Sequence, residues 1–480
     1  MVSGTRVPAD DVPLCVDLDG TLLRTDSLVE ATLLLLKGAP SAVLLLPIWL
    51  LRGKAVLKDE VAKRVTLDPA ALPYRDELLE FLRVERAKGR SLLLVSAAHE
   101  SIVRAVARHL GLFDDVIATD AATNLKGAAK RAALVERFGT GGFDYAGDSP
   151  ADVPVWEAAR RAIVVSNDAD LARRAGPRVD RIFTSPARRV SALARALRVP
   201  QWVKNFLVFV PLLMAPEARE LPLFLDAALA FAAFSVCASA VYVANDLLDL
   251  AADRRHRTKS RRPFAAGDLP LAAGLALIPA CLVAGFGIAW LFLPPAFLGV
   301  LTVYLAVTTA YSFRLKHVPL VDVIVLALLY TGRVIAGAAA THVWPSPWIL
   351  GFSLFFFLSL AFVKRYAELY VLRGEPPELR VRGYYPTDLQ LVAVNGAVSG
   401  YIAVLVAALY INSDRVVGVY ARPELLWLIC PLLLYWISRI WMLAFRGQLH
   451  DDPVLFAITD RESWIVGSLI AAVLLLARLL

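Results

Sequence analysis

The segment YVANDLLDLAAD, residues 242–253, decides how the second half of this sequence is interpreted. It closes a long apolar run, and Asp246, Asp249 and Asp253 follow one another at spacings of three and four residues. On a helix this spacing places the three carboxylates on one face. Carboxylates at the edge of a membrane are costly unless they bind an ion, so the face predicts a Mg²⁺ site that in turn holds a diphosphate. A solvated helix end is the simpler alternative.

A basic segment, RRHRTKSRRP at residues 254–263, follows directly. Its cations include Lys259, Arg261 and Arg262, which can pair with phosphate oxygens. The two segments could bind one diphosphate together. A metal ion would link the diphosphate to the carboxylates, and the cations of the basic segment would pair with it directly.

Composition divides the chain between two solvents. Hydrophobic residues make up 58% of the 480 residues and charged residues 20%, and 54 of the 94 charged residues lie within residues 1–200. A bilayer core of about 30 Å requires apolar runs of about 20 residues, and nine such spans are predicted. They lie near residues 200–216, 222–246, 271–292, 295–312, 320–341, 347–370, 389–411, 423–445 and 462–479.

Basic residues predict the orientation of these spans. The connections after the second, fourth, sixth and eighth spans hold 15 Lys and Arg residues, whereas the alternate connections hold Arg219, Arg415 and Arg422. The start of the sequence shows no secretory signal, and the four cysteines are too dispersed for a disulfide framework or a zinc site. We expect a multi-pass protein of a bacterial-type inner (plasma) membrane, with the N-terminal domain and the active sites in the cytoplasm. Anionic headgroups of membrane lipids or phosphorylated substrates, and not nucleic acid, are the expected partners of the basic residues behind the net charge of +8.

Residues 12–185 have a different pattern. Short apolar runs such as PLCVDLDGT, RSLLLVSAAHE and FDYAGDS end in turn residues and alternate with helical stretches. This alternation predicts an α/β domain with a parallel sheet, followed by an all-α transmembrane bundle. The expected domains are residues 1–185, a basic amphipathic linker at 186–199, and the bundle at 200–480.

The helical insertion at residues 27–88 contains the apolar run LLLLKGAPSAVLLLPIWLLRG, residues 33–53. Two interpretations stay open for it. In the first, it forms a cap packed over a site. In the second, it touches the membrane surface without crossing it, because Lys37, Gly38 and Pro40 interrupt the run and make it a poor span.

Polar residues stand at the ends of several predicted strands. Asp17 and Asp19 close the first strand on the same side of its tip. Ser96 ends the strand LLLVS, Lys126 lies in NLKG, and Asp148 and Asp152 lie in AGDSPADV. An anionic phosphoryl group requires neutralisation, which Mg²⁺ on hard oxygen ligands and a lysine can supply. A covalent aspartyl phosphate would divide a hydrolysis into two easier steps.

This set resembles the haloacid dehalogenase superfamily of phosphatases over residues 12–185, with the helical cap of the phosphoserine-phosphatase-like branch. The resemblance implies that Asp17 is the nucleophile and Asp19 the general acid/base. The other roles that it implies are phosphate anchoring by Ser96 and Lys126, and Mg²⁺ binding by Asp17, Asp148 and Asp152. An inactive copy kept as a scaffold is the alternative.

Residues 197–480 resemble the UbiA superfamily of intramembrane transferases, through the pattern NDxxDxxxD, the basic run ending in RP and the nine predicted spans. On this resemblance Asn245, Asp246, Asp249 and Asp253 hold Mg²⁺, and YSFRLK with Tyr311 and Lys316 matches a further element. Asp322 falls where a second acidic motif begins. Prenyl-diphosphate users carry DxxxD there, whereas Leu326 stands four residues after Asp322. This departure argues against a second magnesium cluster.

Four further segments resemble the decaprenyl-phosphate phosphoribosyltransferase branch: QWVKN at 201–205, RVIAG at 333–337, KRYAEL at 364–369 and LHDDP at 449–453. This resemblance implies phosphoribosyl pyrophosphate as donor and a polyprenyl (decaprenyl-like) phosphate as acceptor. The cations that would orient the acceptor are Lys204, Lys316, Arg333, Lys364 and Arg365. Tyr311 either contacts substrate or anchors the chain at the membrane interface.

The sequence therefore predicts a transferase that moves phosphoribosyl to a polyprenyl phosphate, with a fused Mg²⁺-dependent phosphatase that removes the 5-phosphate of the product. The first alternative is a UbiA-type prenyltransferase that moves a polyprenyl chain from its diphosphate to an aromatic or other small acceptor. The second is an inactive membrane-tethered scaffold. Both a monomer and a homo-oligomer stay open.

Overall fold

The structure is a computed structural model that describes residues 12–120, 125–184, 189–213, 220–373, 380–413, 416, 420–449 and 452–479. Arg219, Arg415, His450 and Asp451, which belong to loops used in the sequence arguments, lie outside these residues. The chain forms two compact units. The first contains residues 1–197 and 242–278, and the second contains residues 198–241 and 279–480. The acidic and basic segments at 242–263 therefore belong to the same unit as the N-terminal domain.

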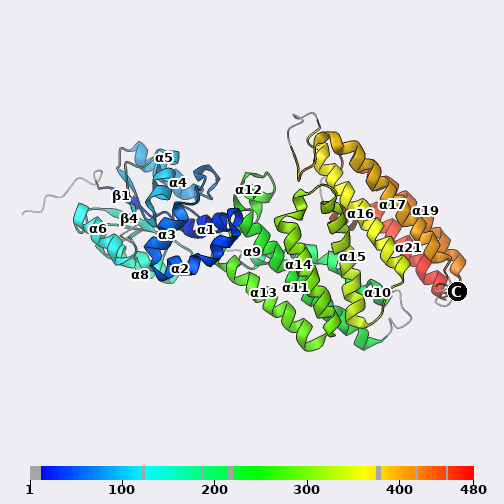
Figure 1. The fold of residues 1–480 in the computed structure, drawn as a ribbon. Coiled ribbons are helices and arrows are strands. Elements are labelled where there is room, and N and C mark those ends of the chain that lie inside the picture. The colour runs from blue at the N-terminus through cyan, green and yellow to red at the C-terminus, as the bar shows by residue number, and fades with distance from the viewer. Residues whose placement is uncertain are drawn as a thin grey trace, which may run out of the picture. The chain divides into compact units, whose positions relative to one another are not determined.

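The first unit is built on a parallel six-stranded sheet (Figure 1). Its strands are β1 (Leu14–Val16), β2 (Leu92–His99), β3 (Asp115–Thr119), β4 (Asp144–Gly147), β5 (Ala162–Val165) and β6 (Val179–Phe183), in the order β3-β2-β1-β4-β5-β6. The order reverses on either side of β1. In a parallel sheet such a reversal opens a crevice at the carboxyl ends of the strands, where ligands bind.

Helices cover both faces of the sheet, because side chains of a strand alternate between its faces. Leu14 and Val16 face α4 (Asp76–Ala87) and α5 (Glu100–Leu110), whereas Cys15 faces α6 (Ala128–Phe138), α7 (Val153–Ala158) and α8 (Ala169–Arg174). The α/β prediction is confirmed, and each of the three quoted apolar runs contains a strand, β1, β2 and β4. The sixth strand was not predicted, because the exposed edge segment VDRIF carries two charges.

A helical cap follows β1, as predicted. It consists of α1 (Ser27–Gly38), the short 3-10 helix η1 (Pro40–Leu44), α2 (Leu46–Leu51) and α3 (Lys54–Ala62). Leu33 of α1 packs with Ala192 and Ala196 of α9 (Arg189–Ala196) and with Leu247 at the end of α11 (Leu221–Leu248). A buried ion pair also joins α1 to α12 (Leu250–Arg255), because Arg254 donates to both carboxylate oxygens of Glu30 at 2.6 and 2.9 Å.

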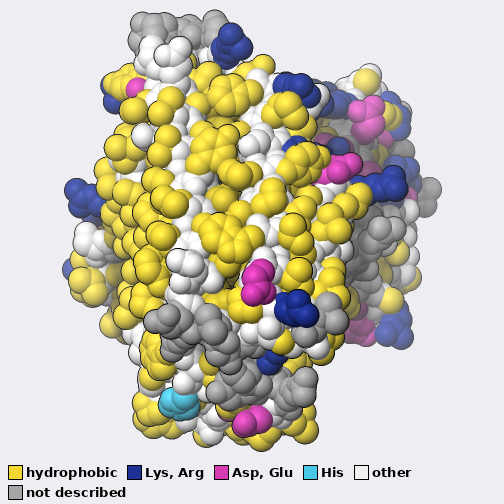
Figure 2. Space-filling view, turned by 90° about the vertical axis from the view of Figure 1, so that its right-hand side faces the viewer, with side chains coloured by type: hydrophobic (Ala, Val, Ile, Leu, Met, Phe, Trp, Pro, Cys, Tyr) yellow, Lys and Arg dark blue, Asp and Glu magenta, His cyan; other side chains and the backbone are white. Residues whose placement is uncertain are grey.

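The second unit is helical. Among the described residues, eight helices are long and apolar enough to cross a membrane. They are α11, α13 (Leu271–Phe292), α14 (Pro295–Phe313), α15 (Val321–Thr341), α16 (Pro347–Tyr370), α17 (Leu389–Ile411, with the preceding turn from Pro386), α19 (Ile429–Phe445, with the preceding turn from Pro423) and α21 (Arg461–Leu479). α20 (Pro453–Thr459) is a short helix of this unit, whereas the short α12 (Leu250–Arg255) belongs to the first unit. Apolar side chains cover most of the face seen in Figure 2, as expected of a surface in contact with lipid.

The first predicted span, 200–216, has a different structure. Its described part forms the 3-10 helix η5 (Val199–Phe209) and one turn of α-helix, α10 (Val210–Leu213), and this apolar segment is too short to span. Two prolines interrupt the segment, and Lys204 and Asn205 are buried by it. The polar residues at its start are therefore held inside the second unit.

Candidate active sites

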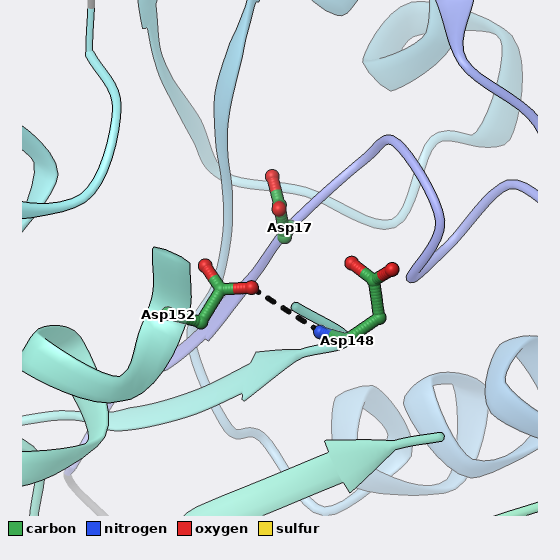
Figure 3. Close-up of side chains that lie close together, drawn as sticks. All are labelled: Asp17, Asp148 and Asp152. Atoms are coloured by element: carbon green, nitrogen blue, oxygen red, sulfur yellow. Dashed lines mark hydrogen bonds between the residues drawn. The ribbon is translucent and has the colours of Figure 1, made fainter. Parts of the chain in front are cut away.

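Three carboxylates meet at the carboxyl ends of β1 and β4. Asp17 follows β1 directly, Asp148 follows β4, and Asp152 ends the next turn, Pro150–Asp152. One oxygen of each lies within 4.8 Å of the others (Figure 3). Within the described ranges this is the one group of three or more acidic, histidine or cysteine side chains that close together. The sequence placed these three residues at strand ends, and the sheet topology brings them together.

Backbone geometry holds the three carboxylates in place. Gly20 adopts a φ of +75°, and a Cβ at this position would lie 2.1 Å from Oδ2 of Asp148. The adjacent Thr21 donates its hydroxyl to Oδ1 of Asp148 at 3.0 Å. Oδ2 of Asp152 accepts the backbone N–H groups of Asp148 and Ser149, at 3.3 and 3.1 Å. The glycine is therefore required both for its backbone conformation and for the close approach of the carboxylate.

Asp19 points away from this group toward the cap. The backbone N–H of Ser27 donates to its Oδ1 at 2.8 Å, and the Ser27 hydroxyl donates to its Oδ2 at 3.1 Å. Burial, together with the charge of Asp26, raises the pKa of Asp19 to about 8. A small pocket lies beside Ser27, between the cap and the sheet. Its lining includes Leu28, Ala31, Lys58, Val61, His99 and Ile102.

The lysine that contacts Asp17 is Lys130, a residue that the sequence analysis did not select. Its buried ammonium lies 3.0 Å from Oδ1 of Asp17 and 3.5 Å from Oδ1 of Asp152, and it donates to the hydroxyl of Tyr145 at 2.7 Å. Lys126 is exposed and precedes α6, four residues before Lys130 in the chain. The signal that could have found Lys130 is its position on the buried face of α6, four residues before Leu134.

Lys126 nevertheless lies near the cap. Burial, chiefly, lowers the pKa of Lys58, and the charge of Lys126 acts in the same direction. Ser96 is buried in β2, where its hydroxyl accepts the backbone N–H of Ala98 at 3.0 Å. The phosphate-anchoring roles of Ser96 and Lys126 stay predictions.

The carboxylate group suits a divalent cation. Burial raises the pKa of Asp17 to about 6 despite the opposing charge of Lys130. Burial, with the charges of Asp17 and Asp152, raises the pKa of Asp148 to about 7. Three hard oxygen donors that repel one another, with one lysine between them, fit the chemistry that Mg²⁺ requires.

The second acidic group lies where α11 ends and α12 begins. Arg262 donates through Nη1 to Oδ1 of Asp246 at 3.1 Å and to Oδ2 of Asp253 at 2.6 Å. Asp249 lies at the break between the two helices and pairs with Lys37 of α1 at 2.7 Å. The guanidinium of Arg262 thus neutralises two of the three carboxylates, and the three do not lie as close together as the carboxylates of the first group. The Mg²⁺ site at this segment stays a prediction. Lys37 was not selected as a site residue from the sequence, because it lies 212 residues from Asp249 in the chain and no neighbouring motif indicates the contact.

The other sequence-predicted residues of this segment lie close by in the chain. Asn245 belongs to the last turn of α11, and its carbonyl accepts the backbone N–H of Asp249 at 3.0 Å. Lys259 and Arg261 form the 3-10 turn η7 (Lys259–Arg261). Their phosphate-binding roles stay predictions.

In the second unit Asp322 is neutralised by an arginine. Arg365 and Asp322 are both fully buried, and Nη2 of Arg365 lies 2.6 Å from Oδ2 of Asp322. The hydroxyl of Tyr384 donates to Oδ1 of Asp322 at 2.6 Å, and Arg365 also pairs with Glu368. Asp322, the one carboxylate that this chain has in the second acidic motif, is therefore held in an ion pair. This agrees with the presence of Leu326 where that motif would carry its second carboxylate.

Two further cation groups lie in the second unit. Lys204 and Lys364 share Oδ2 of Asp452, at 2.7 and 3.3 Å. Although burial by itself acts in the opposite direction, Lys364 and Lys204 hold the pKa of Asp452 well below its usual range. Arg333 is buried and donates to Oδ1 of Asn205 at 2.8 Å and to the carbonyl of Leu329 at 2.6 Å.

Tyr311 and Lys316 lie at the end of α14 and in the turn after it. The hydroxyl of Tyr311 accepts a hydrogen bond from Arg382 at 3.1 Å. Lys316 belongs to the 3-10 turn η8 (Leu315–His317). The guanidinium of Arg382 therefore holds the ring of Tyr311 by its hydroxyl.

Family models match both parts of the chain. Residues 206–457 match the UbiA prenyltransferase family, and residues 14–157 match the haloacid dehalogenase-like hydrolase family. The chain belongs to the UbiA prenyltransferase family. Its haloacid dehalogenase-like (HAD) domain contains Asp17, Asp148 and Asp152, and its UbiA domain contains the acidic segment at 242–253 and the Asp322–Arg365 pair.

Curated relatives share either the fusion or the UbiA domain. The uncharacterized protein y4nM of Sinorhizobium fredii is 39% identical over 97% of this chain and 91% of its own length. Nodulation protein NoeC of Azorhizobium caulinodans is 36% identical over 56% of this chain and 87% of its own. The decaprenyl-phosphate phosphoribosyltransferase of Mycolicibacterium smegmatis is 37% identical over 58% of this chain and 89% of its own. The chain is thus a multi-pass UbiA-type transferase with a HAD phosphatase domain.

Proposed function

We propose that the UbiA domain transfers a phosphoribosyl group from phosphoribosyl pyrophosphate to a polyprenyl phosphate. The ion pair of Asp322 with Arg365 carries this proposal. A donor whose diphosphate is held between two magnesium clusters would require a second carboxylate four residues after Asp322, where this chain has Leu326. The remaining carboxylate, Asp322, is paired with the fully buried Arg365. The identity of 37% with a decaprenyl-phosphate phosphoribosyltransferase supports the same donor and acceptor.

The donor would bind at residues 242–262. As the bond between C1 of the ribose and the pyrophosphate oxygen breaks, negative charge accumulates on the pyrophosphate. Mg²⁺ on Asn245, Asp246, Asp249 and Asp253 would stabilise that charge. Arg262 already lies between Asp246 and Asp253, so its guanidinium would be within reach of a phosphate held by that Mg²⁺. Lys259 and Arg261, in the adjoining turn, would pair with the remaining phosphate oxygens.

The acceptor phosphate would bind to Lys204 and Lys364. Their two charges surround a single carboxylate, Asp452, which leaves a net positive charge in a largely buried place. A lipid phosphate is already ionised near neutral pH, so the chain needs to orient its oxygen toward C1 but does not need a strong base. The oxygen forms the new bond to C1, and pyrophosphate leaves with the electron pair of the broken bond. Orientation by the lysines would supply much of the catalysis.

The HAD domain would then remove the 5-phosphate of the product. In this reaction Asp17 attacks the phosphorus, and Asp19, held by Ser27, protonates the departing hydroxyl. Water hydrolyses the aspartyl phosphate after giving a proton to Asp19. Lys130 holds Asp17, while Ser96 and Lys126 would contact the phosphate. We place both reactions at the cytoplasmic side of a bacterial inner membrane.

The transfer is tested with the purified full chain, Mg²⁺, phosphoribosyl pyrophosphate and polyprenyl phosphates of several chain lengths. Mass spectrometry should show a pentose-phosphate or pentose adduct of the lipid. The variant Asp249→Asn should lose this product, and the matched control Asp268→Asn, an exposed acid of the same segment, should retain it. Entry of a labelled prenyl chain into a small acceptor, with no pentose adduct for any lipid, would refute the proposal.

The phosphatase step is tested separately by the variant Asp17→Asn. This variant should accumulate the lipid that still carries the 5-phosphate, because the nucleophile is absent while the UbiA domain is unchanged. The exposed Asp76 of α4 offers the control, Asp76→Asn, which should release phosphate as the native chain does. Equal release of phosphate by the Asp17 variant would exclude the role.

A further inference from the structure

The cap exposes an unusual number of large apolar side chains. In the described part of residues 12–184, the exposed large apolar residues are Leu34, Val43, Leu44, Leu45, Ile48, Leu50 and Leu51 in the cap, with Val84 and Ile182 elsewhere. Leu44 is 73% exposed and Leu51 is 89% exposed. We call Val43, Leu44, Leu45, Ile48, Leu50 and Leu51 the apolar cap surface. Contiguous exposed apolar patches on a folded domain mark an interaction site.

The apolar cap surface is held by a packed inner side. Trp49, only 5% exposed, and Ala42 lie on the same two turns, η1 and α2. They pack against Leu35 of α1 and Val61 of α3, and the guanidinium of Arg64 lies 4.6 Å from the ring centroid of Trp49. The outward leucines are therefore presented by a fixed structure, and their exposure is not the result of a loose loop.

The charges around the surface match an anionic lipid layer. Between Glu30 and Asp59 the sequence has no acidic residue, whereas Lys37, Arg52, Lys54 and Lys58 all fall in that interval. Arg52 and Lys54 follow the apolar cap surface directly and are exposed. An apolar face flanked by cations is the pattern of a segment that lies in the interface of an anionic membrane.

The fold connects the cap to segments that span the membrane. Within the first unit, Leu33 of α1 packs against Val243 and Leu247 at the end of α11 and against Leu271 at the start of α13. Both α11 and α13 are long and apolar enough to span. Because the helix that leads into η1 is packed on the ends of two spanning helices, the cap stays close to the bilayer wherever the chain is inserted.

We propose that the apolar cap surface inserts into the headgroup region of the membrane and so delivers lipid-borne phosphate to the HAD site. The pocket beside Ser27, the residue that donates to Asp19, is lined on one side by α1 and α3, which flank the apolar cap surface in the chain. Insertion of η1 and α2 holds this pocket near the depth at which lipid phosphates lie. The choice of a lipid-borne substrate rests on the proposed function, whereas the insertion itself does not.

Insertion is tested by fluorescence quenching in vesicles of phosphatidylethanolamine and phosphatidylglycerol. A bimane label is attached to Leu44→Cys or Leu51→Cys in the full chain, with Cys430→Ala because Cys430 is the one native cysteine that is not buried. Lipid-borne nitroxides should quench both labels, and aqueous iodide should not. The control Val84→Cys, 46% exposed on α4, should show the opposite pattern.

Two results of the labelling experiment would overturn the proposal. One is iodide quenching of the Leu44 and Leu51 labels to the same extent as the Val84 label. The other is crosslinking between Leu44→Cys residues of two chains without lipid quenching, which would assign the surface to a second copy.

Delivery of substrate is tested with the double variant Leu44→Asp/Leu51→Asp. Both side chains are exposed, so hydrolysis of soluble p-nitrophenyl phosphate should be unchanged. Hydrolysis of a phosphate carried by a vesicle lipid should fall at least tenfold. Equal loss with both substrates, or no loss with either, would contradict delivery. If the native chain hydrolyses no lipid phosphate, the proposed function fails while the quenching result still decides insertion.

Discussion

Replacement of Lys130 by methionine tests the charge balance of the HAD site. The Lys130 ammonium is buried between Asp17 and Asp152, whose side chains are also almost inaccessible to solvent. Removing one partner of a buried ion pair costs about 3–5 kcal/mol, because the remaining charge stays buried without compensation. For a unit of this size 1 kcal/mol corresponds to roughly 2–4 °C. Lys130→Met should therefore lower the midpoint of the first unit by roughly 6–20 °C in EDTA.

Magnesium should restore part of this loss. A divalent cation on Asp17, Asp148 and Asp152 would compensate the same carboxylates that lose the lysine. Ligand at about 100 times its dissociation constant stabilises the folded state by about 2.7 kcal/mol. Because the competing ammonium is absent, the shift of the midpoint on adding Mg²⁺ should be larger in Lys130→Met than in the native chain.

The assay is thermal unfolding of the purified full chain in detergent, followed by intrinsic tryptophan fluorescence, with EDTA or with Mg²⁺. Lys88→Ala is the matched control, because Lys88 is an exposed lysine that pairs with Glu85 at the surface. Its effect should stay below about 1 kcal/mol. A midpoint of Lys130→Met within 2 °C of the native value in EDTA, or a Mg²⁺ shift no larger than that of the native chain, would refute the reasoning.

Three further substitutions have definite outcomes. Gly20→Ala should lower phosphatase activity about 100-fold, because the new Cβ would lie 2.1 Å from an oxygen of Asp148. A displacement of a reacting group by about 1 Å has an effect of this size. Activity within twofold of the native chain would contradict the prediction. Lys37→Ala should lower the free energy of unfolding by less than about 1 kcal/mol, because the ion pair of Lys37 with Asp249 is exposed. A larger loss of stability would show that the pair is structural. Gly337→Ala should destabilise the second unit by about 1–3 kcal/mol, because its Cβ would lie 1.9 Å from a backbone carbonyl of η5. The control Gly332→Ala meets nothing within 4 Å and should melt like the native chain, and equal midpoints for both variants would reject the packing argument.

Local pattern was sufficient for most elements of this chain. An apolar run has to be buried either in a sheet between helices or in lipid, and the length of the run distinguishes the two. The strand ending at Val16 and the span beginning at Pro295 were therefore placed almost to the residue. The pattern failed at β6, an edge strand whose charges face solvent. It also failed at 200–216, where Pro200, Pro211 and the buried Lys204 lie in the short described part of the segment.

The sequence by itself indicated the acidic residues of both candidate sites, because the end of a strand and the end of a span are places where a carboxylate needs an ion or a cationic partner. Only the tertiary structure decided which cations meet these carboxylates. Lys130 faces Asp17, Lys37 faces Asp249 and Arg365 faces Asp322, across separations of up to 212 residues. The energy of a charge pair depends on the distance between the charges and on their burial, and neither quantity can be obtained from the residues that are neighbours in the sequence.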